Sequence, residues 1–251
     1  MTPKRLGLNH EEHTFYAEDK TQLSGWLIPN QSKKVKKSRG LVVLFHGNAQ
    51  NISTHFANLA WVVKEGYDLF IWDYRGYGKS EGESTPDGIF QDSLAALDHV
   101  RKLSRNKSYK KLILFGQSLG GVVLMRALEE DRFNKTGDFV VLDSTFSSYQ
   151  DIAFDRLKSS AVTFIFSPIS YLLISDQYAP KRFLTENKRP TLVIHGDADQ
   201  VVPLNFGKEI YEKLQTKRKW LWKIPKGRHI CAFCEEGPKN RDKFLKLISE
   251  I

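Results

Sequence analysis

Short apolar segments alternate along this chain with longer segments of helical periodicity. Each apolar segment is hydrophobic at nearly every position and is flanked by turn residues, which is typical of strands covered on both faces of a sheet. The longer segments between them predict helices that cross over from one strand to the next. The pattern therefore predicts an α/β protein with a mostly parallel sheet. The expected strands are 41–45, 69–72, 112–115, 139–142, 192–194 and 220–222.

The predicted helices carry signals of their own. Thr85 followed by Pro86 is typical of an N-cap with proline at the first helical position, and apolar residues recur at three- and four-residue spacing as far as Leu103. Near the N-terminus, residues 13–16 and 23–28 predict an antiparallel hairpin at the sheet edge. Further helices are expected at 54–64, 119–130, 205–214 and 239–251.

The segment 144–189 does not fit this alternation. It lies between two predicted strands and contains the apolar stretch AVTFIFSPISYLLI at residues 161–174. This stretch is shorter than the roughly 20 apolar residues of a membrane-spanning helix, and Pro168 interrupts it. We therefore predict a lid inserted into a single α/β domain of residues 1–251, a length that such folds commonly fill.

The formal net charge of +9 raises the question of a nucleic acid or an anionic membrane as partner. The excess is dispersed, except for a basic run between two predicted strands. We interpret this run as a solvated loop, with weak peripheral contact to an anionic membrane surface as the alternative. No nucleic-acid-binding motif accompanies it, so nucleic acid is not an expected partner. The run consists of Lys33, Lys34, Lys36, Lys37 and Arg39.

The first 13 residues lack the apolar stretch of a secretory signal, and two cysteines do not imply a disulfide framework. Both features favour a reducing, cytoplasmic location. Cys231 and Cys234 form a single C-x-x-C pair, which cannot complete a four-ligand zinc site. We therefore expect two reduced thiols and no metal, with a redox effect on the nearby His229 as the alternative.

The motif GQSLGG at residues 116–121 directly follows a predicted strand and opens a predicted helix. This is the setting of a G-x-S-x-G nucleophile elbow, in which the serine sits in a strained turn and glycines leave room for the neighbouring strand and helix. A serine hydroxyl also needs a general base, which a carboxylate orients. We therefore predict Ser118 as a nucleophile, with its partners later in the chain.

Five motifs occur in the order that serine hydrolases use. They are HGNA at 46–49, DYRGYGKS at 73–80, GQSLGG at 116–121, HGDADQVVP at 195–203 and GRH at 227–229. Together they resemble the signatures of serine α/β-hydrolases of the serine-aminopeptidase-like and acylglycerol-lipase-like group. The resemblance implies the α/β-hydrolase fold, with a mostly parallel central sheet flanked by helices, and a Ser-Asp-His triad that uses no cofactor.

The resemblance also implies roles for particular residues. It places the triad acid at Asp199, the last position of H-G-x-x-D, with Asp197 and Asp143 as alternatives, and the general base at His229. The oxyanion of a tetrahedral intermediate would be bound by two backbone amides, because such donors stabilise the developing charge. Those amides are assigned to Asn48 and Leu119.

The remaining motif residues have structural interpretations. His46 and His195 end predicted strands beside glycines, so we expect them to brace loops. Asp73, Arg75 and Gly76 match a family signature, and we interpret them as a structural brace that takes no part in catalysis.

The predicted reaction is acyl transfer through an acyl-enzyme, on a small or lipid-like carboxylic ester or acyl thioester. Phe164, Phe166 and Leu172 in the predicted lid are the candidates for binding an apolar acyl group. An aminopeptidase or other amidase is the alternative reaction, because the same triad serves esters, thioesters and amides. A non-catalytic member of the fold that binds a ligand or a partner is the further alternative.

Overall fold

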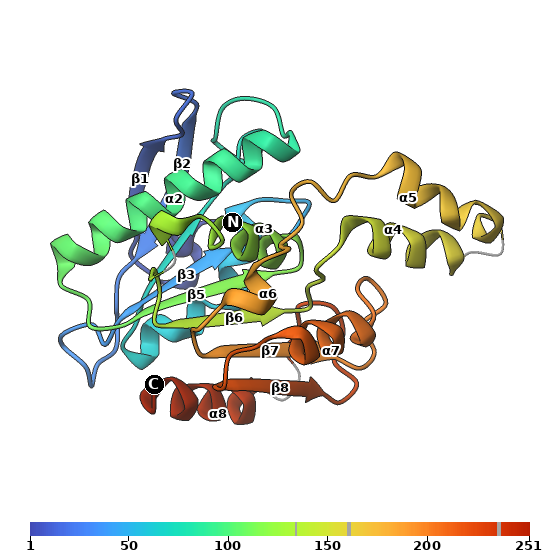
Figure 1. Cartoon of the computed structure of the whole chain (residues 1–251). Coiled ribbons are helices and arrows are strands. Elements are labelled where there is room, and N and C mark those ends of the chain that lie inside the picture. The colour runs from blue at the N-terminus through green and yellow to red at the C-terminus, as the bar shows by residue number, and fades with distance from the viewer. Residues whose placement is uncertain (134, 160–161, 235–236) are drawn as a thin grey trace.

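The computed structural model of the chain describes all residues except 134, 160–161 and 235–236 (Figure 1). The strands are β1 (Glu11–Tyr16), β2 (Gln22–Ile28), β3 (Leu41–Phe45), β4 (Asp68–Trp72), β5 (Leu112–Gln117), β6 (Phe139–Asp143), β7 (Thr191–Gly196) and β8 (Lys219–Ile224). Within the described residues they form one eight-stranded sheet, in the order β1-β2-β4-β3-β5-β6-β7-β8. The strands β1 and β2 form an antiparallel hairpin at one edge, and β2 runs antiparallel to β4. All later neighbours are parallel, which confirms the predicted sheet.

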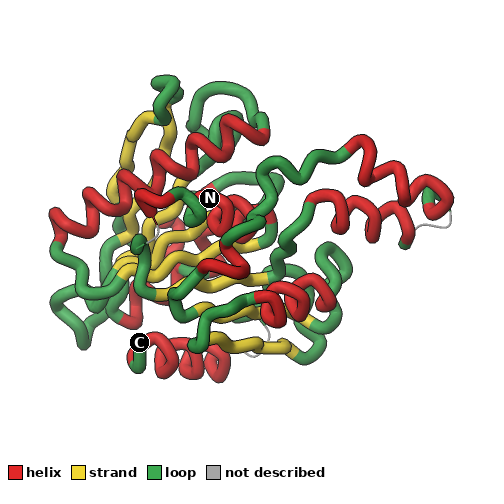
Figure 2. Tube along the Cα trace, viewed as in Figure 1, coloured by secondary structure: helices red, strands yellow, loops and turns green. Residues whose placement is uncertain are grey.

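Helices cover both faces of this sheet (Figure 2). The α-helices are α1 (Ile52–His55), α2 (Pro86–Lys107), α3 (Leu119–Ala127), α4 (Tyr149–Lys158), α5 (Ser170–Leu173), α6 (Phe183–Glu186), α7 (Leu204–Lys213) and α8 (Gly237–Ser249). The 3-10 helices are η1 (Pro3–Leu6), η2 (Phe56–Asn58), η3 (Ala60–Glu65), η4 (Asp131–Phe133) and η5 (Phe164–Ile169). Residues of α2, α3, α6 and α7 pack into the core on one face, and residues of η2, η3 and α8 pack into the core on the other.

The start of α2 follows from its sequence. The side chain of Thr85 accepts a hydrogen bond from Gly88 N at 3.1 Å, and Pro86 occupies the first helical position, where its missing N–H costs nothing. By contrast, the single helix expected at 54–64 is divided into α1, η2 and η3. The backbone at Leu59, with φ −119° and ψ 2°, leaves the helical region and interrupts the hydrogen-bond ladder.

Within the described residues, the segment predicted as a lid includes a helical arm, defined here as residues 149–159 and 162–174. In Figure 1 the arm extends beyond the carboxyl ends of the parallel strands, with α4 and α5 side by side. None of the described residues of α4 is buried. The chain returns to the core at α6, where Phe183 is fully packed. The arm is therefore stabilised mainly by contacts among its own helices.

The side chains of the basic run are exposed, as expected for a solvated loop. Among the described residues, no helix is both long enough and apolar enough to cross a bilayer. The cytoplasmic location and the weak membrane contact of the basic run stay predictions.

Candidate active site

Ser118 occupies the sharp turn between β5 and α3. Its backbone has φ 53° and ψ −123°, a positive φ that a residue with a side chain adopts only at an energetic cost. The turn directs the chain from the carboxyl end of a central parallel strand straight into a helix. The strained serine therefore lies where a nucleophile elbow places its nucleophile.

Two glycines allow the elbow to pack this closely. A Cβ atom at Gly120 would lie 2.1 Å from the carbonyl oxygen of Phe45, at the end of β3. A Cβ atom at Gly116 would lie 2.5 Å from the Cα of Gly121 in α3. Any side chain at these positions would push the helix away from the sheet, which explains the glycines of the motif.

Asp199 and His229 meet across two different loops, which follow β7 and β8. Asp199 Oδ1 accepts hydrogen bonds from the amides of Val201 (2.8 Å) and Val202 (2.9 Å), and Asp199 Oδ2 lies 2.8 Å from His229 Nδ1. Burial raises the pKa of Asp199, but the hydrogen bonds from His229 and Val202 outweigh it, so this pKa lies below its ordinary value. An ionised carboxylate only accepts hydrogen bonds. His229 Nδ1 therefore carries the proton, and His229 Nε2 is left as a base.

The two alternative carboxylates have other partners. Asp197 is exposed, and its Oδ1 accepts a hydrogen bond from Lys226 N at 2.6 Å. Asp143 is buried at the end of β6, where it accepts hydrogen bonds from Gln117 Nε2 (3.0 Å) and Ser144 Oγ (3.3 Å). Burial raises the pKa of Asp143 to about 6. Of these three carboxylates, Asp199 is the one hydrogen-bonded to the imidazole of His229.

Of the two residues assigned to the oxyanion site, one precedes the nucleophile in the chain and the other directly follows it. Leu119 is the first residue of α3, directly after Ser118. Asn48 lies in the exposed loop after β3, and its Oδ1 accepts a hydrogen bond from Tyr77 Oη at 2.7 Å. A Cβ atom at Gly47 would lie 3.3 Å from Ser118 Cβ, so this loop packs against the elbow.

His46 and His195 brace loops, as the sequence predicts. His46 Nδ1 lies 2.8 Å from the carbonyl oxygen of Gly47, and His195 Nε2 lies 2.7 Å from the carbonyl oxygen of Val202. Both imidazoles are fully buried. Each ring therefore holds the backbone of a loop that borders the site.

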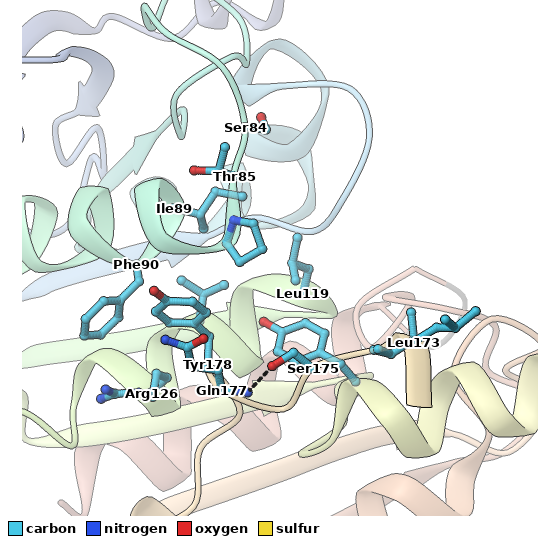
Figure 3. A pocket seen from close by; sticks show the side chains of 14 residues that line it. Ser84, Thr85, Ile89, Phe90, Leu119, Arg126, Leu173, Ser175, Gln177 and Tyr178 are labelled. Atoms are coloured by element: carbon cyan, nitrogen blue, oxygen red, sulfur yellow. Dashed lines mark hydrogen bonds between the residues drawn. The ribbon is translucent and has the colours of Figure 1, made fainter. Parts of the chain in front are cut away.

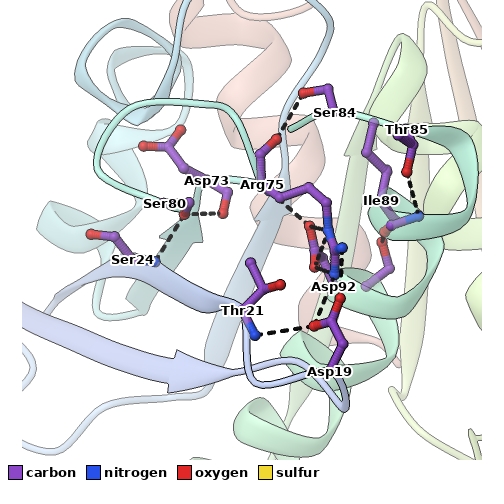
Figure 4. Close-up of polar contacts among 12 residues, drawn as sticks. Asp19, Thr21, Ser24, Asp73, Arg75, Ser80, Ser84, Thr85, Ile89 and Asp92 are labelled. Carbon is purple, nitrogen blue, oxygen red and sulfur yellow. Dashed lines mark hydrogen bonds and ion pairs between the residues drawn. The ribbon is translucent and has the colours of Figure 1, made fainter. Parts of the chain in front are cut away.

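The second motif is also structural, as predicted (Figure 4). Arg75 Nη2 lies 2.8 Å from Asp92 Oδ1, and Arg75 Nη1 lies 2.8 Å from Asp19 Oδ2. The hydrogen bonds to Asp92 and Asp19 raise the pKa of Arg75 above its ordinary value. Asp73 accepts a hydrogen bond from the first amide of α1 at 2.9 Å, and Gly76 turns the chain with φ 74°. This cluster links the hairpin, α2 and the turn after β4.

An apolar cavity of about 420 Å³ lies beside the elbow, between α2, α3 and the base of the arm (Figure 3). Leu119 contributes to its wall, so the cavity begins next to the nucleophile. Arg126 is its one cation among the described lining residues, and its guanidinium lies 4.4 Å from the Phe90 ring centre and 3.0 Å from Glu130 Oε1. The lining residues are Ser84, Thr85, Pro86, Ile89, Phe90, Leu119, Val123, Arg126, Tyr149, Leu173, Ile174, Ser175, Gln177 and Tyr178.

The structure does not bring Phe164, Phe166 and Leu172 to this cavity. Their side chains are exposed on the arm, with exposed fractions of 53%, 60% and 84%. The arm contributes its first residue, Tyr149, and its last residues to the cavity wall, and α2, α3 and Tyr178 contribute the rest of the apolar lining. The apolar face of α2 packs into the core on one face of the sheet. The first turn of that face, which includes Ile89, also borders the cavity.

The two cysteines differ from the expectation of reduced thiols, which is wrong for this structure. Cys231 and Cys234 form a disulfide, with 5.0 Å between their Cα atoms. The turn explains the pairing, because Cys234 N donates to the carbonyl oxygen of Cys231 at 3.3 Å and so brings the two side chains together. Within the described part of the chain, no group of three or more His, Cys, Asp or Glu side chains could hold a metal ion.

Comparisons with known proteins agree with this geometry. A family model described as serine aminopeptidase, S33, matches residues 36–164. The uncharacterised protein YfhR of Escherichia coli K12 is 33% identical over 241 residues, which cover 95% of this chain and 80% of that protein. The α/β hydrolase domain-containing protein WAV2 of Arabidopsis thaliana is 28% identical over 94% of this chain and 78% of its own length.

A solved structure extends the likeness to the whole fold. The esterase Pf2001 of Pyrococcus furiosus superposes with a TM-score of 0.74 and 26% identity, over 98% of this chain and 93% of that chain. The strand order, the strained serine and the matches to family model and relatives agree with one another. This chain therefore belongs to the serine aminopeptidase S33 family of α/β-hydrolases.

Proposed function

We propose that this protein is a serine hydrolase that cleaves carboxylic esters or acyl thioesters through an acyl-enzyme on Ser118. The observation that carries the proposal is the 2.8 Å hydrogen bond between His229 Nδ1 and Asp199 Oδ2. These residues follow β7 and β8, and Ser118 follows β5. Since the three strands are parallel, all three loops lie at the same edge of the sheet, where α/β proteins place their ligand sites.

The reaction then proceeds in two acyl-transfer steps. His229 Nε2 removes the proton from Ser118 Oγ, which attacks the substrate carbonyl carbon. The backbone amides of Leu119 and Asn48 bind the oxyanion, and Asp199 stabilises the imidazolium of His229. His229 gives its proton to the leaving alcohol or thiol. Water then attacks the acyl-enzyme with His229 as base, and His229 returns this proton to Ser118 Oγ as the acid is released.

The cavity beside Leu119 supports an apolar acyl group as the substrate's acyl portion. Its volume of about 420 Å³ falls within the usual range of small-molecule sites. Most of its walls are apolar side chains, and the charge of Arg126 is paired with Glu130. We propose that the acyl chain lies between α2, α3 and the last residues of the arm.

The alternative reaction, an aminopeptidase, has less support from this cavity. A peptide N-terminus is a cation, and a buried cation needs an anionic partner. None of the described residues that line the cavity carries a carboxylate, whereas Arg126 does carry a positive charge. This lining favours an uncharged ester or thioester over a peptide with a free amino terminus.

Labelling with a fluorophosphonate probe tests the proposed function. The native protein should be labelled and should hydrolyse p-nitrophenyl esters, and Ser118→Ala should lose both properties while keeping its thermal stability. Ser249→Ala, on the exposed end of α8, is the matched control and should behave like the native protein. Equal labelling of Ser118→Ala and the native protein would show that Ser118 is not the nucleophile, and a protein without any turnover would favour a binding role.

A further inference from the structure

Two of the three consecutive residues 143–145, where β6 ends, contact the nucleophile turn. The carbonyl oxygen of Asp143 accepts a hydrogen bond from Ser118 N at 2.9 Å, and Thr145 Oγ1 donates to the carbonyl oxygen of Ser118 at 2.6 Å. Both backbone polar groups of the nucleophile are therefore held by residues that flank Ser144. Asp143, Ser144 and Thr145 are each 1% exposed.

The middle residue of the three contacts the histidine loop. Ser144 Oγ accepts a hydrogen bond from Ile230 N at 3.0 Å, and Ile230 directly follows His229. Ser144 Oγ in turn donates to Asp143 Oδ1 at 3.3 Å. Because the hydroxyl proton is directed to this carboxylate, a lone pair of Ser144 Oγ remains for the amide of Ile230.

The backbone of this contact is strained on both sides. Ser144 has φ 53° and Ile230 has φ 50°, in the left-handed region that residues with side chains rarely adopt. Isoleucine is β-branched, so its positive φ is especially costly. Such conformations persist where the surrounding contacts determine them, and they concentrate at functional sites.

We propose that Ser144 and Thr145 are positioning residues that set the spacing between Ser118 and His229. Thr145 holds the backbone of the nucleophile, and Ser144 holds the backbone beside the base. Asp143 connects the two, through its carbonyl oxygen to Ser118 and through its carboxylate to Ser144. This inference rests on the proposed function, since it needs a reaction between Ser118 and His229.

Loss of the Ser144 or Thr145 hydroxyl is expected to slow the chemical step. A displacement of about 1 Å between reacting groups can reduce a rate about 100-fold, because the reaction depends on the alignment of nucleophile and base. Neither Ser144 nor Thr145 lines the cavity, so substrate binding should change little. Loss of either hydroxyl should therefore lower kcat by at least about tenfold and leave KM within about twofold of the native value.

The test compares hydroxyl-removing variants with matched controls. Ser144→Ala and Thr145→Val should both lose kcat, whereas Thr145→Ser keeps the hydroxyl and should retain it. Thr216→Val and Thr191→Val remove buried hydroxyls that bond to Lys188 O and Arg189 O, away from the site, and should retain kcat. Thermal midpoints of all five variants separate a loss of stability from a loss of rate.

The outcomes are distinct. The positioning role would be overturned if Thr145→Val keeps the native kcat, or if kcat in Thr145→Ser is as low as in Thr145→Val. In either case, Ser118-dependent labelling would leave the proposed function standing. If Ser144→Ala does not fold, the three-way comparison at Thr145 decides the question alone. Absence of Ser118-dependent labelling in the native protein would overturn the proposed function, and the positioning role with it.

Discussion

His229 donates its Nδ1 proton to Asp199 Oδ2 over 2.8 Å, and the same carboxylate is held by two backbone amides through its other oxygen. The amides come from the turn after Asp199 itself, so this turn orients the carboxylate independently of its contact with His229. This arrangement keeps Asp199 ionised and His229 in one tautomer. Both conditions are required if His229 Nε2 is to take a proton from Ser118.

Asparagine substitutions should rank the three carboxylates by the loss of kcat that each substitution causes. Asp199→Asn should lower kcat by about 10⁴-fold, because the amide favours the wrong tautomer of the imidazole. Asp197→Asn should have little effect, since Asp197 is exposed and bonded to Lys226 N. Asp143→Asn should fall between them, through the contact of Asp143 with Ser144. Steady-state kinetics on one ester checks the order, and a larger loss in Asp143→Asn than in Asp199→Asn would move the acid to β6.

Asp143 should also make stability depend on pH. Its pKa in the folded protein is raised to about 6, from an ordinary value of 3.8. The folded state therefore binds the proton more tightly, and the stability that protonation contributes is present below about pH 4 and is lost as the pH rises through about 6. Asp143→Asn cannot titrate at this position, so its unfolding free energy relative to the native protein should increase between pH 4 and pH 7.

Urea unfolding at the two pH values measures this difference, and Asp197→Asn provides a control with little pH dependence. In the native protein, a hydrogen bond from Lys226 N and the side chain of Lys223 hold the pKa of Asp197 below its ordinary value. The stability that ionised Asp197 contributes is therefore already present above its unfolded pKa of about 3.8, and the difference between Asp197→Asn and the native protein should stay nearly constant between pH 4 and pH 7. Parallel trends in the two variants would contradict the assignment.

The Arg75 brace should matter for stability rather than for chemistry. Arg75→Ala leaves the fully buried carboxylate of Asp92 without its cation, a change that typically costs about 3–5 kcal/mol of unfolding free energy. The exposed pair of Lys79 and Glu12, 3.0 Å apart, is the control, and Lys79→Ala should cost about 0–1 kcal/mol. Denaturant unfolding checks both values, and equal effects of the two substitutions would show that the buried pair contributes little.

Much of the sheet and the site was predictable from local sequence. The segment 41–45 forms β3 with the predicted bounds, because a short apolar run flanked by turn residues is typical of a strand covered on both faces. The elbow at Ser118 was predictable because its glycines record a packing constraint that a Cβ atom would violate. These features depend on neighbours in the sequence or on steric constraints, and both select particular residue types.

Long-range hydrogen bonds and the destination of apolar side chains were not predictable in this way. Ser144 and Ile230 are far apart in the sequence, and their residue types do not predict that they form a hydrogen bond. Hydrophobicity alone does not say whether a side chain faces the core, a ligand or solvent. Leu172 and Ile89 illustrate this, because the first is exposed on the arm and the second borders the cavity.

The position of the cavity leads to a prediction about acyl chain length. Each methylene that becomes buried should contribute up to about 0.8 kcal/mol, or roughly a fourfold increase in kcat/KM, until the cavity is full. Catalytic efficiency on p-nitrophenyl esters should therefore rise with acyl length and then level off. Ile89→Phe inserts extra volume into the wall, so the rise should end at a shorter chain while acetate ester hydrolysis is unchanged.

Leu172→Phe is the matched control for that experiment, because it adds a phenyl ring at an exposed position of the arm that does not line the cavity. It should leave the whole chain-length series unchanged. If Leu172→Phe alters the preference for long esters and Ile89→Phe does not, then the acyl chain binds along the arm, as the apolar sequence of 161–174 first suggested. If both variants lower activity equally on all esters, the cavity does not bind the acyl chain, and the assignment of Ser118, Asp199 and His229 is unaffected.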